Sequence, residues 1–379
     1  MDYRDTPEEA EFRARLRSWL AEHRPAELPS GADERMEALN RWHRELYEAG
    51  WIGLAFPVEY GGHGRSPVYE AILNDEIGLA GAPPPPAIGH ISNAIRLFGT
   101  DEQKRRHLPG LLSSTVRWCQ GFSEPGAGSD LGGIRTRAAR VDRPGGDVYE
   151  VAGQKIWTSE AVWSQWCLLL CRTAPDLPSP KALTMLMVPM DAAGVECRGI
   201  VTAYGTQEFA EVWFDGVEVP VGDVLGEPGQ GWAIAMQLLG YERGPADVGW
   251  VARLARTVNR LVDDVRDGRV AAGPAERRRL ARAWSEVTAL QLHVRRTMSS
   301  RLDGSTPGPE GSVDKLLVTR AEQLLAHVNL ELRGTGALLA PDEVAVEGYV
   351  WSRAQSIFGG TQQIQRNIVA QRVLGLPRS

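Results

Sequence analysis

The stretch WCQGFSEPGAGSDLGG, from Trp118 to Gly133, decides how the rest of the chain is interpreted. It holds a polar turn at Ser123-Glu124-Pro125, followed by Gly126 and Gly128. Glycine lets the backbone approach a ligand closely and leaves N–H groups facing it. Clusters of Gly, Ser and Pro also mark ordinary turns between strands. On composition alone, a ligand-binding loop and a plain turn are both open.

The bulk composition is that of a large globular protein. A length of 379 residues allows two or three domains around a sizeable core. The net charge of −6 argues against nucleic acid or an anionic membrane as the main partner. No apolar run is long enough to span a bilayer, and Met1 to Ala10 lacks the apolar segment of a signal peptide, so we expect a cytoplasmic location. Cys167 and Cys171 flank three leucines, which predicts buried thiols and no metal site.

Residues 7 to 112 are predicted to be mostly helical. Pro7 suits the first turn of a helix, and apolar residues recur behind it at helical spacing. Thr100 and Gln103 form a capping box, in which each side chain bonds the backbone N–H of the other. The helix that they start is expected to end near Pro109-Gly110. Further helices are expected at 33–49 and 67–79.

Between about Arg117 and Gly226 the pattern changes to short β-rich runs separated by Gly and Pro turns. Strands follow one another without helices between them, which favours an antiparallel sheet or barrel. Asp215-Gly216 predicts a tight turn inside the last run, and Val141 to Asp147 predicts an exposed hairpin tip. The expected strands are 135–142, 147–153, 165–173, 182–189 and 208–219.

From Gly231 the chain is predicted to be helical again, with long helices separated by Gly and Pro. They are expected at 231–267, 274–302, 310–338 and 347–372. The order of the elements predicts an α+β fold in three parts, α–β–α. We expect an N-terminal all-α domain (1–116), a central antiparallel β-barrel or sheet domain (117–228) and a C-terminal four-helix bundle (229–379).

Common catalytic motifs do not fit. Gly121 to Pro125 misses the nucleophile elbow, because Pro stands at its fifth position. Gly226 to Gly231 opens a predicted helix, but its glycines are in the wrong order for a dinucleotide fingerprint. The sequence also contains neither a Walker motif nor a His-Glu-x-x-His zinc motif.

A set of other segments, taken together, resembles the acyl-CoA dehydrogenase family of flavoproteins. They follow the family's order over nearly the whole chain and reproduce the α–β–α layout. The segments are Phe56–Gly62 (FPVEYGG), Phe98–Lys104 (FGTDEQK) with Leu108-Pro109, Gly121–Asp130 (GFSEPGAGSD), Gly153–Ser159 (GQKIWTS), Val217–Pro220 with Gly226–Gly231 (GEPGQG), Glu242-Arg243, and Phe358–Gln365 (FGGTQQIQ).

The resemblance implies FAD as cofactor, bound between the β domain and the bundle. It implies an acyl-CoA substrate that is oxidised at Cα–Cβ to a 2,3-enoyl-CoA, with the hydride passing to flavin N5 and the electrons on to an electron-transferring flavoprotein. By position, the implied site residues are Phe122 and Ser123 as flavin contacts, Trp157 and Ser159 at the flavin edge near N5, Gly360, Thr361 and Gln363 as C-terminal cofactor contacts, and Ser129 at the CoA portion. The family usually has Thr at the Ser159 position, so the hydroxyl is kept.

The reaction needs a base for the α-proton. Many members carry a Glu directly before the Gly-Thr of the C-terminal motif, where this chain has Gly359. The Gly359 backbone N–H can still polarise the thioester carbonyl. A second group of members keeps the base on the first bundle helix, directly before an Arg. This chain resembles that group, with Glu242 as the base and Arg243 beside the substrate.

Two departures from the family bear on assembly. The Arg-x-x-Phe-Gly segment, by which many members reach the FAD diphosphate of a neighbouring subunit, is absent at Asp267 to Pro274, where only Arg266 or Arg269 could substitute. A later Gly-Gly-x-Gly run is reduced to Gly334 to Ala337. Related chains with such gaps assemble with a paralogue, so a homotetramer and a heterotetramer are both open.

Two other functions stay open. The same fold serves flavin oxidases and monooxygenases, which do not need Glu242. A non-catalytic subunit that completes the site of a partner is the other alternative. The sequence does not identify the acyl group, although a base on the bundle helix resembles branched-chain, long-chain and sterol-side-chain members and favours a bulky one.

Overall fold

The computed structural model describes residues 4–85, 89–241, 245–302, 308–339 and 343–377. The chain divides into two compact units. The helical unit comprises residues 1–26, 65–85 and 242–379, and the sheet unit comprises residues 27–64 and 86–241. Each unit therefore combines segments that lie far apart in the sequence.

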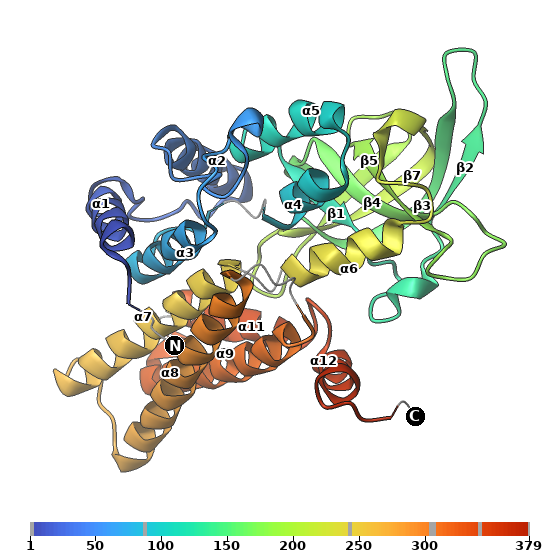
Figure 1. Cartoon of the computed structure of the whole chain (residues 1–379). Helices are drawn as coiled ribbons and strands as arrows, with labels where there is room; N and C mark the ends of the chain where they lie inside the picture. Colours follow the sequence, from blue (N-terminus) through green and yellow to red (C-terminus); the bar gives the residue numbers. More distant parts are fainter. Residues whose placement is uncertain (1–3, 86–88, 242–244, 303–307, 340–342, 378–379) are drawn as a thin grey trace. The chain divides into compact units, whose positions relative to one another are not determined.

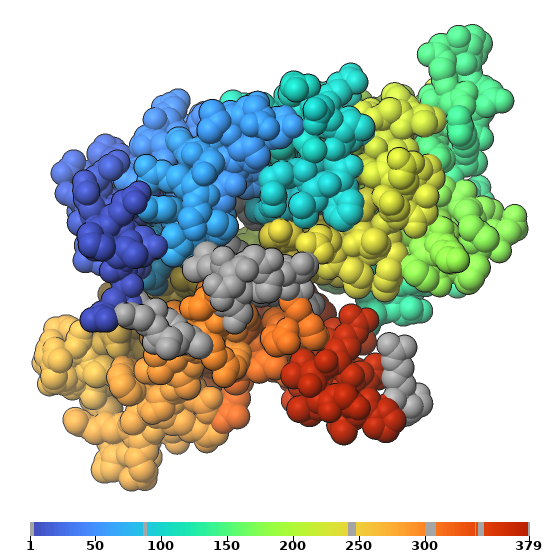
Figure 2. Space-filling view, in the orientation of Figure 1, coloured from blue at the N-terminus to red at the C-terminus, as the bar shows by residue number. Residues whose placement is uncertain are grey.

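The sheet unit is built on one mixed sheet (Figure 1). Within the described residues the strand order is β6-β7-β3-β2-β4-β5-β8, and β1 pairs with β4 off this path. The strands are β1 (Trp118–Gly121), β2 (Arg137–Val141), β3 (Val148–Ser159), β4 (Trp166–Arg172), β5 (Leu183–Pro189), β6 (Val195–Ile200), β7 (Phe209–Pro220) and β8 (Val224–Leu225). The predicted hairpin tip between β2 and β3 is confirmed, and it projects from the surface of this unit (Figure 2).

Two strand predictions are corrected. β1 pairs with β4 in parallel, and β2 meets β4 in parallel at one residue pair, whereas the other pairings are antiparallel. The sequence also missed β1, β6 and β8. Asp215-Gly216 does not reverse the chain but lies inside β7, where Val217 pairs with Val151 and Asp215 with Ala152. The extra residue is Gly216, whose φ of 65° makes it a bulge that bends the strand.

Helices α2 (Ala32–Glu48), α4 (Gly89–Phe98), α5 (Asp101–Leu112) and α6 (Gly231–Tyr241) complete the sheet unit. The predicted capping box of α5 is present, with both reciprocal bonds between Thr100 and Gln103. Helix α5 ends at Leu112, two residues past the expected end near Pro109-Gly110. Leu111 and Leu112 are fully buried, so we attribute the extension to their packing, which outweighs the bond that Pro109 cannot donate.

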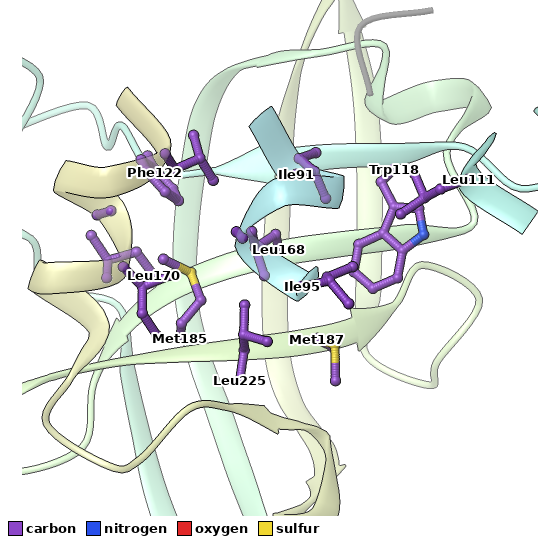
Figure 3. Packing of buried hydrophobic residues seen from close by; sticks show 14 of the residues in the cluster. Ile91, Ile95, Leu111, Trp118, Phe122, Leu168, Leu170, Met185, Met187 and Leu225 are labelled. Carbon is purple, nitrogen blue, oxygen red and sulfur yellow. The ribbon is translucent and has the colours of Figure 1, made fainter. Parts of the chain in front are cut away.

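The core of the sheet unit joins the opening stretch to the sheet. Trp118 and Phe122 are buried there with Leu168 of β4 and Met185 of β5, and Ile95 of α4 packs onto the same cluster (Figure 3). The aromatic start of the 118–133 stretch is therefore anchored in the core, whereas Pro125, Gly126 and Gly128 to Asp130 are exposed.

The helical unit contains α1 (Pro7–His23), α3 (Val68–Ala80), α7 (Pro245–Arg266), α8 (Pro274–Leu302), α9 (Gly311–Arg333), α10 (Gly336–Leu339), α11 (Glu343–Ala354) and α12 (Gln362–Ile368). Helices α7, α8 and α9 bury a shared apolar cluster that includes Val258, Leu290 and Leu325. α3 lies against α7 at a close crossing, because a Cβ on Gly78 would lie 2.4 Å from the carbonyl oxygen of Gly249. Glycine at Gly78 is thus required by backbone approach.

One predicted bundle helix is only partly described, and another is corrected. The helix expected at 231–267 is described as α6 and α7 on either side of residues 242–244, which lie outside the described part of the chain. The helix expected at 347–372 is divided into α11 and α12. Gly359 and Gly360 lie between them with φ of 61° and 88°, a left-handed conformation that a right-handed helix cannot contain.

The described helices include none that is both long and apolar enough to cross a bilayer. All four cysteines are free thiols, and Cys167 and Cys171 are buried as predicted. The described residues also contain no cluster of His, Cys, Asp and Glu that could hold a metal ion.

Candidate functional site

The loop after β1 is closed by Glu124. Its backbone exchanges two hydrogen bonds of 3.0 Å with Ala127. Its buried carboxylate accepts hydrogen bonds from the backbone N–H groups of Arg135 (2.6 Å) and Thr136 (2.9 Å). The glycine-rich loop is therefore tied to the chain that leads into β2, and its shape is fixed before any ligand binds.

Lys155 of β3 also holds this loop in place. Its side chain is fully buried, and Nζ donates to Glu124 Oε1 and to the carbonyl oxygen of Phe122, both at 2.9 Å. Burial lowers the pKa of Lys155, and the Glu124 carboxylate opposes this effect. Burial would raise the pKa of Glu124, but the Lys155 charge and the bonds from Arg135 and Thr136 hold that pKa below its ordinary value. The Glu124 carboxyl is therefore ionised at neutral pH, and its negative charge favours the ammonium form of Lys155.

Trp157 stands at an irregularity in β3. The pairing of β3 with β7 shifts register between Lys155 and Thr158, and Trp157 adopts a φ of 59°. This left-handed conformation turns the indole outward, so that Trp157 is 59% exposed while Thr158 is buried. Ser159 is exposed on the same side of the strand as Trp157. A large aromatic side chain is thus presented to the surroundings at the cost of backbone strain.

The loop and the tryptophan lie side by side. The N–H of Ile156 donates to the carbonyl oxygen of Ser123 at 2.9 Å. Gly126 and Gly128 follow in the loop, and a Cβ on either would have no atom of the described residues within 4 Å. Neither glycine has a positive φ, so neither is required by the chain's own conformation or packing. Open backbone beside an exposed indole suits a planar ligand with a phosphate-bearing tail.

The other predicted contacts in the sheet unit differ in exposure. The ring of Phe122 lies in the core, and its carbonyl oxygen is bonded by Lys155. A contact from Phe122 to a flavin would therefore use its backbone N–H. Ser129 is exposed at the far end of the loop.

The helical unit contributes a turn between α11 and α12. Gly359 and Gly360 both have positive φ, and Thr361 caps α12 by accepting a bond from the N–H of Ile364 at 3.3 Å. The fully buried Gln365 donates from Nε2 to the carbonyl oxygens of Gly359 (2.9 Å) and Gly360 (3.2 Å). The turn is thus fixed by its own helix. Gln363, also predicted as a cofactor contact, is exposed.

A partly buried chain of polar side chains lies behind this turn, with Gln355 and Glu322 buried and Lys315 and Trp250 half-buried. Lys315 Nζ of α9 donates to Gln355 Oε1 at 2.6 Å, and Gln355 hydrogen-bonds Glu322. Glu322 also accepts a bond from Trp250 Nε1 at 3.2 Å. Burial raises the pKa of Glu322 to about 7, although Trp250, Gln355 and the nearby cations Lys315 and Arg253 oppose the shift. A carboxyl that titrates near neutrality therefore lies inside the helical unit.

The predicted site residues fall into three groups. Ser123, Trp157 and Ser159 lie together where the loop after β1 meets the end of β3, and Gly359 to Thr361 form the turn of the helical unit. Glu242 and Arg243 lie outside the described residues. Sequence reasoning assigned no role to Glu124, Lys155, Lys315, Gln355 and Glu322. Lys155 and Glu124 stood in quoted motifs, but Lys155 lies beyond the predicted end of its strand, so no signal in the sequence indicated that it is buried.

The two arginines considered for the cofactor diphosphate are engaged locally. Arg269 pairs with Asp264 at 2.7 Å and with Asp267 at 2.9 Å, and Arg266 pairs with Asp263 at 2.9 Å. Both guanidinium groups therefore already have carboxylate partners within their own segment.

Comparison with known families matches three consecutive parts of the chain. Residues 6–115 match the model "Acyl-CoA dehydrogenase, N-terminal domain", residues 119–217 the middle domain and residues 229–374 the C-terminal domain. Among characterised sequences, acyl-CoA dehydrogenase IpdE1 of Mycobacterium tuberculosis is 38% identical, over 97% of this chain and 98% of that protein. Acyl-CoA dehydrogenase FadE26 of the same organism is 32% identical, over 99% and 98%.

Solved structures agree with these matches. The Tcur3481-Tcur3483 steroid ACAD has a TM-score of 0.88 and 30% identity, and the match covers 100% of both chains. The ChsE4-ChsE5 complex from Mycobacterium tuberculosis has a TM-score of 0.83 and 31% identity, also over 100% of both chains.

Proposed function

Because this chain belongs to the acyl-CoA dehydrogenase family, and is therefore an FAD-dependent oxidoreductase, we propose that it dehydrogenates an acyl-CoA thioester to the 2,3-enoyl-CoA with Glu242 as the base. The observation that carries the proposal is Gly359. The C-terminal position of the family's base has no side chain here, while Glu242-Arg243 stands at the alternative position. Two hydrogens must leave the substrate, one as a proton and one as a hydride.

Each residue has a distinct part in this proposal. Glu242 takes the proton from Cα. The N–H of Gly359 polarises the thioester carbonyl, which makes that proton more acidic. FAD, when bound, accepts the hydrogen of Cβ as a hydride. Arg243, the next residue in the sequence, contributes to substrate binding.

The cofactor contacts are supported by features of both units. In the sheet unit, Trp157 is exposed beside the open backbone of Gly126 and Gly128, which fits an isoalloxazine ring and its tail. Ser159 carries the hydroxyl for the flavin edge, and Ser129 is exposed for CoA. In the helical unit, the turn at Gly360 and Thr361, with the exposed Gln363, offers backbone and polar groups for the rest of the cofactor.

We infer that the acyl group is bulky and carries a ring. A Cβ at Gly359 would meet only Lys315 within 4 Å among the described residues, so the position leaves room that a Glu side chain would fill. A structural relative at 30% identity is described as a steroid ACAD. Both observations favour a ring-bearing acyl-CoA over a short straight-chain one.

We also infer assembly with a paralogous chain. The relatives of known structure include two named as pairs of chains, Tcur3481-Tcur3483 and ChsE4-ChsE5. In this chain Arg266 and Arg269 are engaged in local ion pairs, and the usual diphosphate segment is absent. A partner subunit would then complete the FAD site, with an electron-transferring flavoprotein as the electron acceptor. A homotetramer is the alternative.

The proposed reaction is tested by anaerobic addition of acyl-CoA thioesters to the flavin-loaded protein. We expect loss of flavin absorbance with ring-bearing acyl-CoAs, and turnover when ferrocenium is supplied as the acceptor. Rapid reoxidation by oxygen with stoichiometric peroxide or oxygenated product would instead identify an oxidase or monooxygenase. No flavin in the chain or in its complex would identify a non-catalytic partner subunit.

A further inference from the structure

Lys315 of α9 is held against the turn that carries Gly359. Its Nζ donates to Gln355 Oε1 at 2.6 Å and lies 4.3 Å from the centroid of the Phe358 ring. A Cβ on Gly359 would lie 3.7 Å from this Nζ. The ammonium group is therefore fixed from two sides, within contact distance of the position that bears the base in many family members.

The turn itself is rigid. The left-handed conformations of Gly359 and Gly360 are locked by the bonds that Gln365 donates to both carbonyl oxygens. The backbone of Gln355 also contacts the Thr319 hydroxyl, whose one proton is shared between the backbone carbonyl oxygens of Lys315 (2.8 Å) and Gln355 (3.2 Å). The Lys315 ammonium and the Gly359 backbone are thus each held by hydrogen bonds within the helical unit.

The hydrogen bonds that link Lys315, Gln355 and Glu322 allow only one assignment of donors and acceptors. A lysine ammonium can only donate, so Gln355 must turn its oxygen to Lys315 and its NH2 group to Glu322. Trp250, which also can only donate, bonds the other end of the chain at Glu322. Every member therefore supports the position of the ammonium. Holding a four-carbon lysine side chain in one place costs conformational entropy, which favours a role for the fixed charge.

We propose that Lys315 is a positioning residue for the dehydrogenation, which holds the Phe358–Gly359 turn and adds its positive field where the Gly359 N–H polarises the thioester carbonyl. The inference rests on the proposed function. As Glu242 removes the α-proton, negative charge develops on the carbonyl oxygen, and a fixed cation near that oxygen stabilises it. The charge acts through space, so the hydrogen bond to Gln355 does not compete with it.

The test measures the acidity of a bound substrate analogue. Cyclohexylthioacetyl-CoA has sulfur in place of Cβ, so it can lose its α-proton but cannot give up a hydride. Its enolate beside the oxidised flavin produces a long-wavelength charge-transfer absorbance. We would titrate this absorbance against pH in the flavin-loaded wild type and in Lys315→Met, Lys315→Gln and Lys315→Arg.

We expect the midpoint of the titration to rise by about one pH unit or more, a tenfold change in acidity, in the two neutral variants and to stay near the wild-type value in Lys315→Arg. Lys315→Gln keeps a donor for Gln355, so it separates lost charge from lost structure if Lys315→Met folds poorly. Arg320→Met is the matched control, because it removes an exposed cation from the same helix and should leave the midpoint unchanged.

Two outcomes would overturn the inference. If the neutral variants retain FAD and titrate like the wild type, the Lys315 charge does not act on the carbonyl. If the wild type binds the analogue without the absorbance, the proposed dehydrogenation fails, and the inference fails with it. The first outcome leaves the proposed function standing, so the two failures are distinguishable.

Discussion

At the scale of single residues, Trp157 shows how backbone strain and ligand presentation are linked. A tryptophan with a φ of 59° is held in a conformation that costs on the order of 1–3 kcal/mol. In this conformation the Trp157 side chain is 59% exposed. Its ring meets the ring of Phe209 edge-on, with 6.1 Å between the two ring centroids. The sequence motif predicted a role for Trp157, but the left-handed backbone could not be read from it, because Trp itself disfavours that conformation.

Replacing Trp157 by glycine should separate stability from cofactor binding. Glycine relieves the left-handed strain and loses only an exposed side chain, so we expect the free energy of unfolding to change by less than about 1 kcal/mol. FAD affinity should fall clearly in the same variant. Ile156→Gly is the control, because Ile156 does not have a left-handed backbone that glycine could relieve. This variant should lower the free energy of unfolding more than Trp157→Gly does. Equal destabilisation of both variants, or unchanged FAD affinity in Trp157→Gly, would contradict this account.

A second prediction at the scale of residues concerns Glu322 and the pH dependence of the stability of the fold. Burial raises its pKa from 4.5 to about 7 in the folded chain, so the folded state prefers the protonated carboxyl. Its contribution to stability is therefore present below pH 4.5 and is lost as the pH rises through 7. The charged groups that face it are Arg253 and Lys315, which moderate the loss.

Glu322→Gln should then stabilise the protein at pH 8 by up to about 3 kcal/mol and leave it nearly unchanged at pH 4.5. Urea unfolding at the two pH values measures the difference. Glu331→Gln changes a more exposed carboxylate on the same helix and should show no such gain at pH 8. A Glu322→Gln variant that is less stable than the wild type at pH 8 would show that the ionised carboxylate is favoured in the fold.

At the scale of elements, the buried pair of Glu124 and Lys155 joins the glycine-rich loop to β3. Their contact of 2.9 Å is almost fully enclosed, with the side chains 7% and 0% exposed. Removing one partner of such a pair leaves a buried charge and typically costs 3–5 kcal/mol, on the order of half the stability of a domain. The loop that would contact the flavin is thus coupled to the stability of the sheet.

We expect Lys155→Met to lower the free energy of unfolding by about 3–5 kcal/mol. The double variant Glu124→Gln/Lys155→Met should recover much of that loss, because no charge stays buried without its partner. Arg140→Met breaks an exposed ion pair with Asp147 and should cost less than about 1 kcal/mol. A Lys155→Met cost no larger than that of Arg140→Met would contradict the role assigned to the pair.

The elements also show which signals in the sequence were informative. The capping box of α5 and the hairpin tip of β2–β3 were predicted correctly, because each depends on residues within a few positions of one another. The tight turn predicted at Asp215-Gly216 was wrong. The same dipeptide occurs in turns and in bulges, and only the pairing with the neighbouring strand distinguishes the two. β1 was missed for a similar reason: its pairing with β4 is parallel and non-local.

At the scale of the whole molecule, the fold was predictable and the site only in part. Helical, β-rich and helical regions follow one another in the sequence, and the family matches repeat that order. The compact units, however, combine residues 1–26 and 65–85 with the C-terminal helices. Such long-range packing, like the burial of Lys155 or Glu322, depends on contacts that local patterns do not contain.

The proposed assembly with a paralogous chain leads to a prediction at the scale of the whole molecule. The chain produced alone should contain much less than one FAD per subunit, and production together with its paralogous partner chain should restore full occupancy. The physical reason is that Arg266 and Arg269 have carboxylate partners in their own segment. Flavin content from absorbance, with mass by light scattering, is the measurement. A homotetramer with one tightly bound FAD per subunit would exclude the heteromeric arrangement.

The most direct test of the central claim is the rate of anaerobic flavin reduction in Glu242→Gln. A general base contributes about 10²–10⁴-fold to the rate of proton transfer. The variant, matched to the wild type in FAD content, should therefore lose flavin absorbance with a ring-bearing acyl-CoA at least about 100-fold more slowly. Reduction of the Glu242→Gln flavin at the wild-type rate would contradict the assignment of Glu242 as the base.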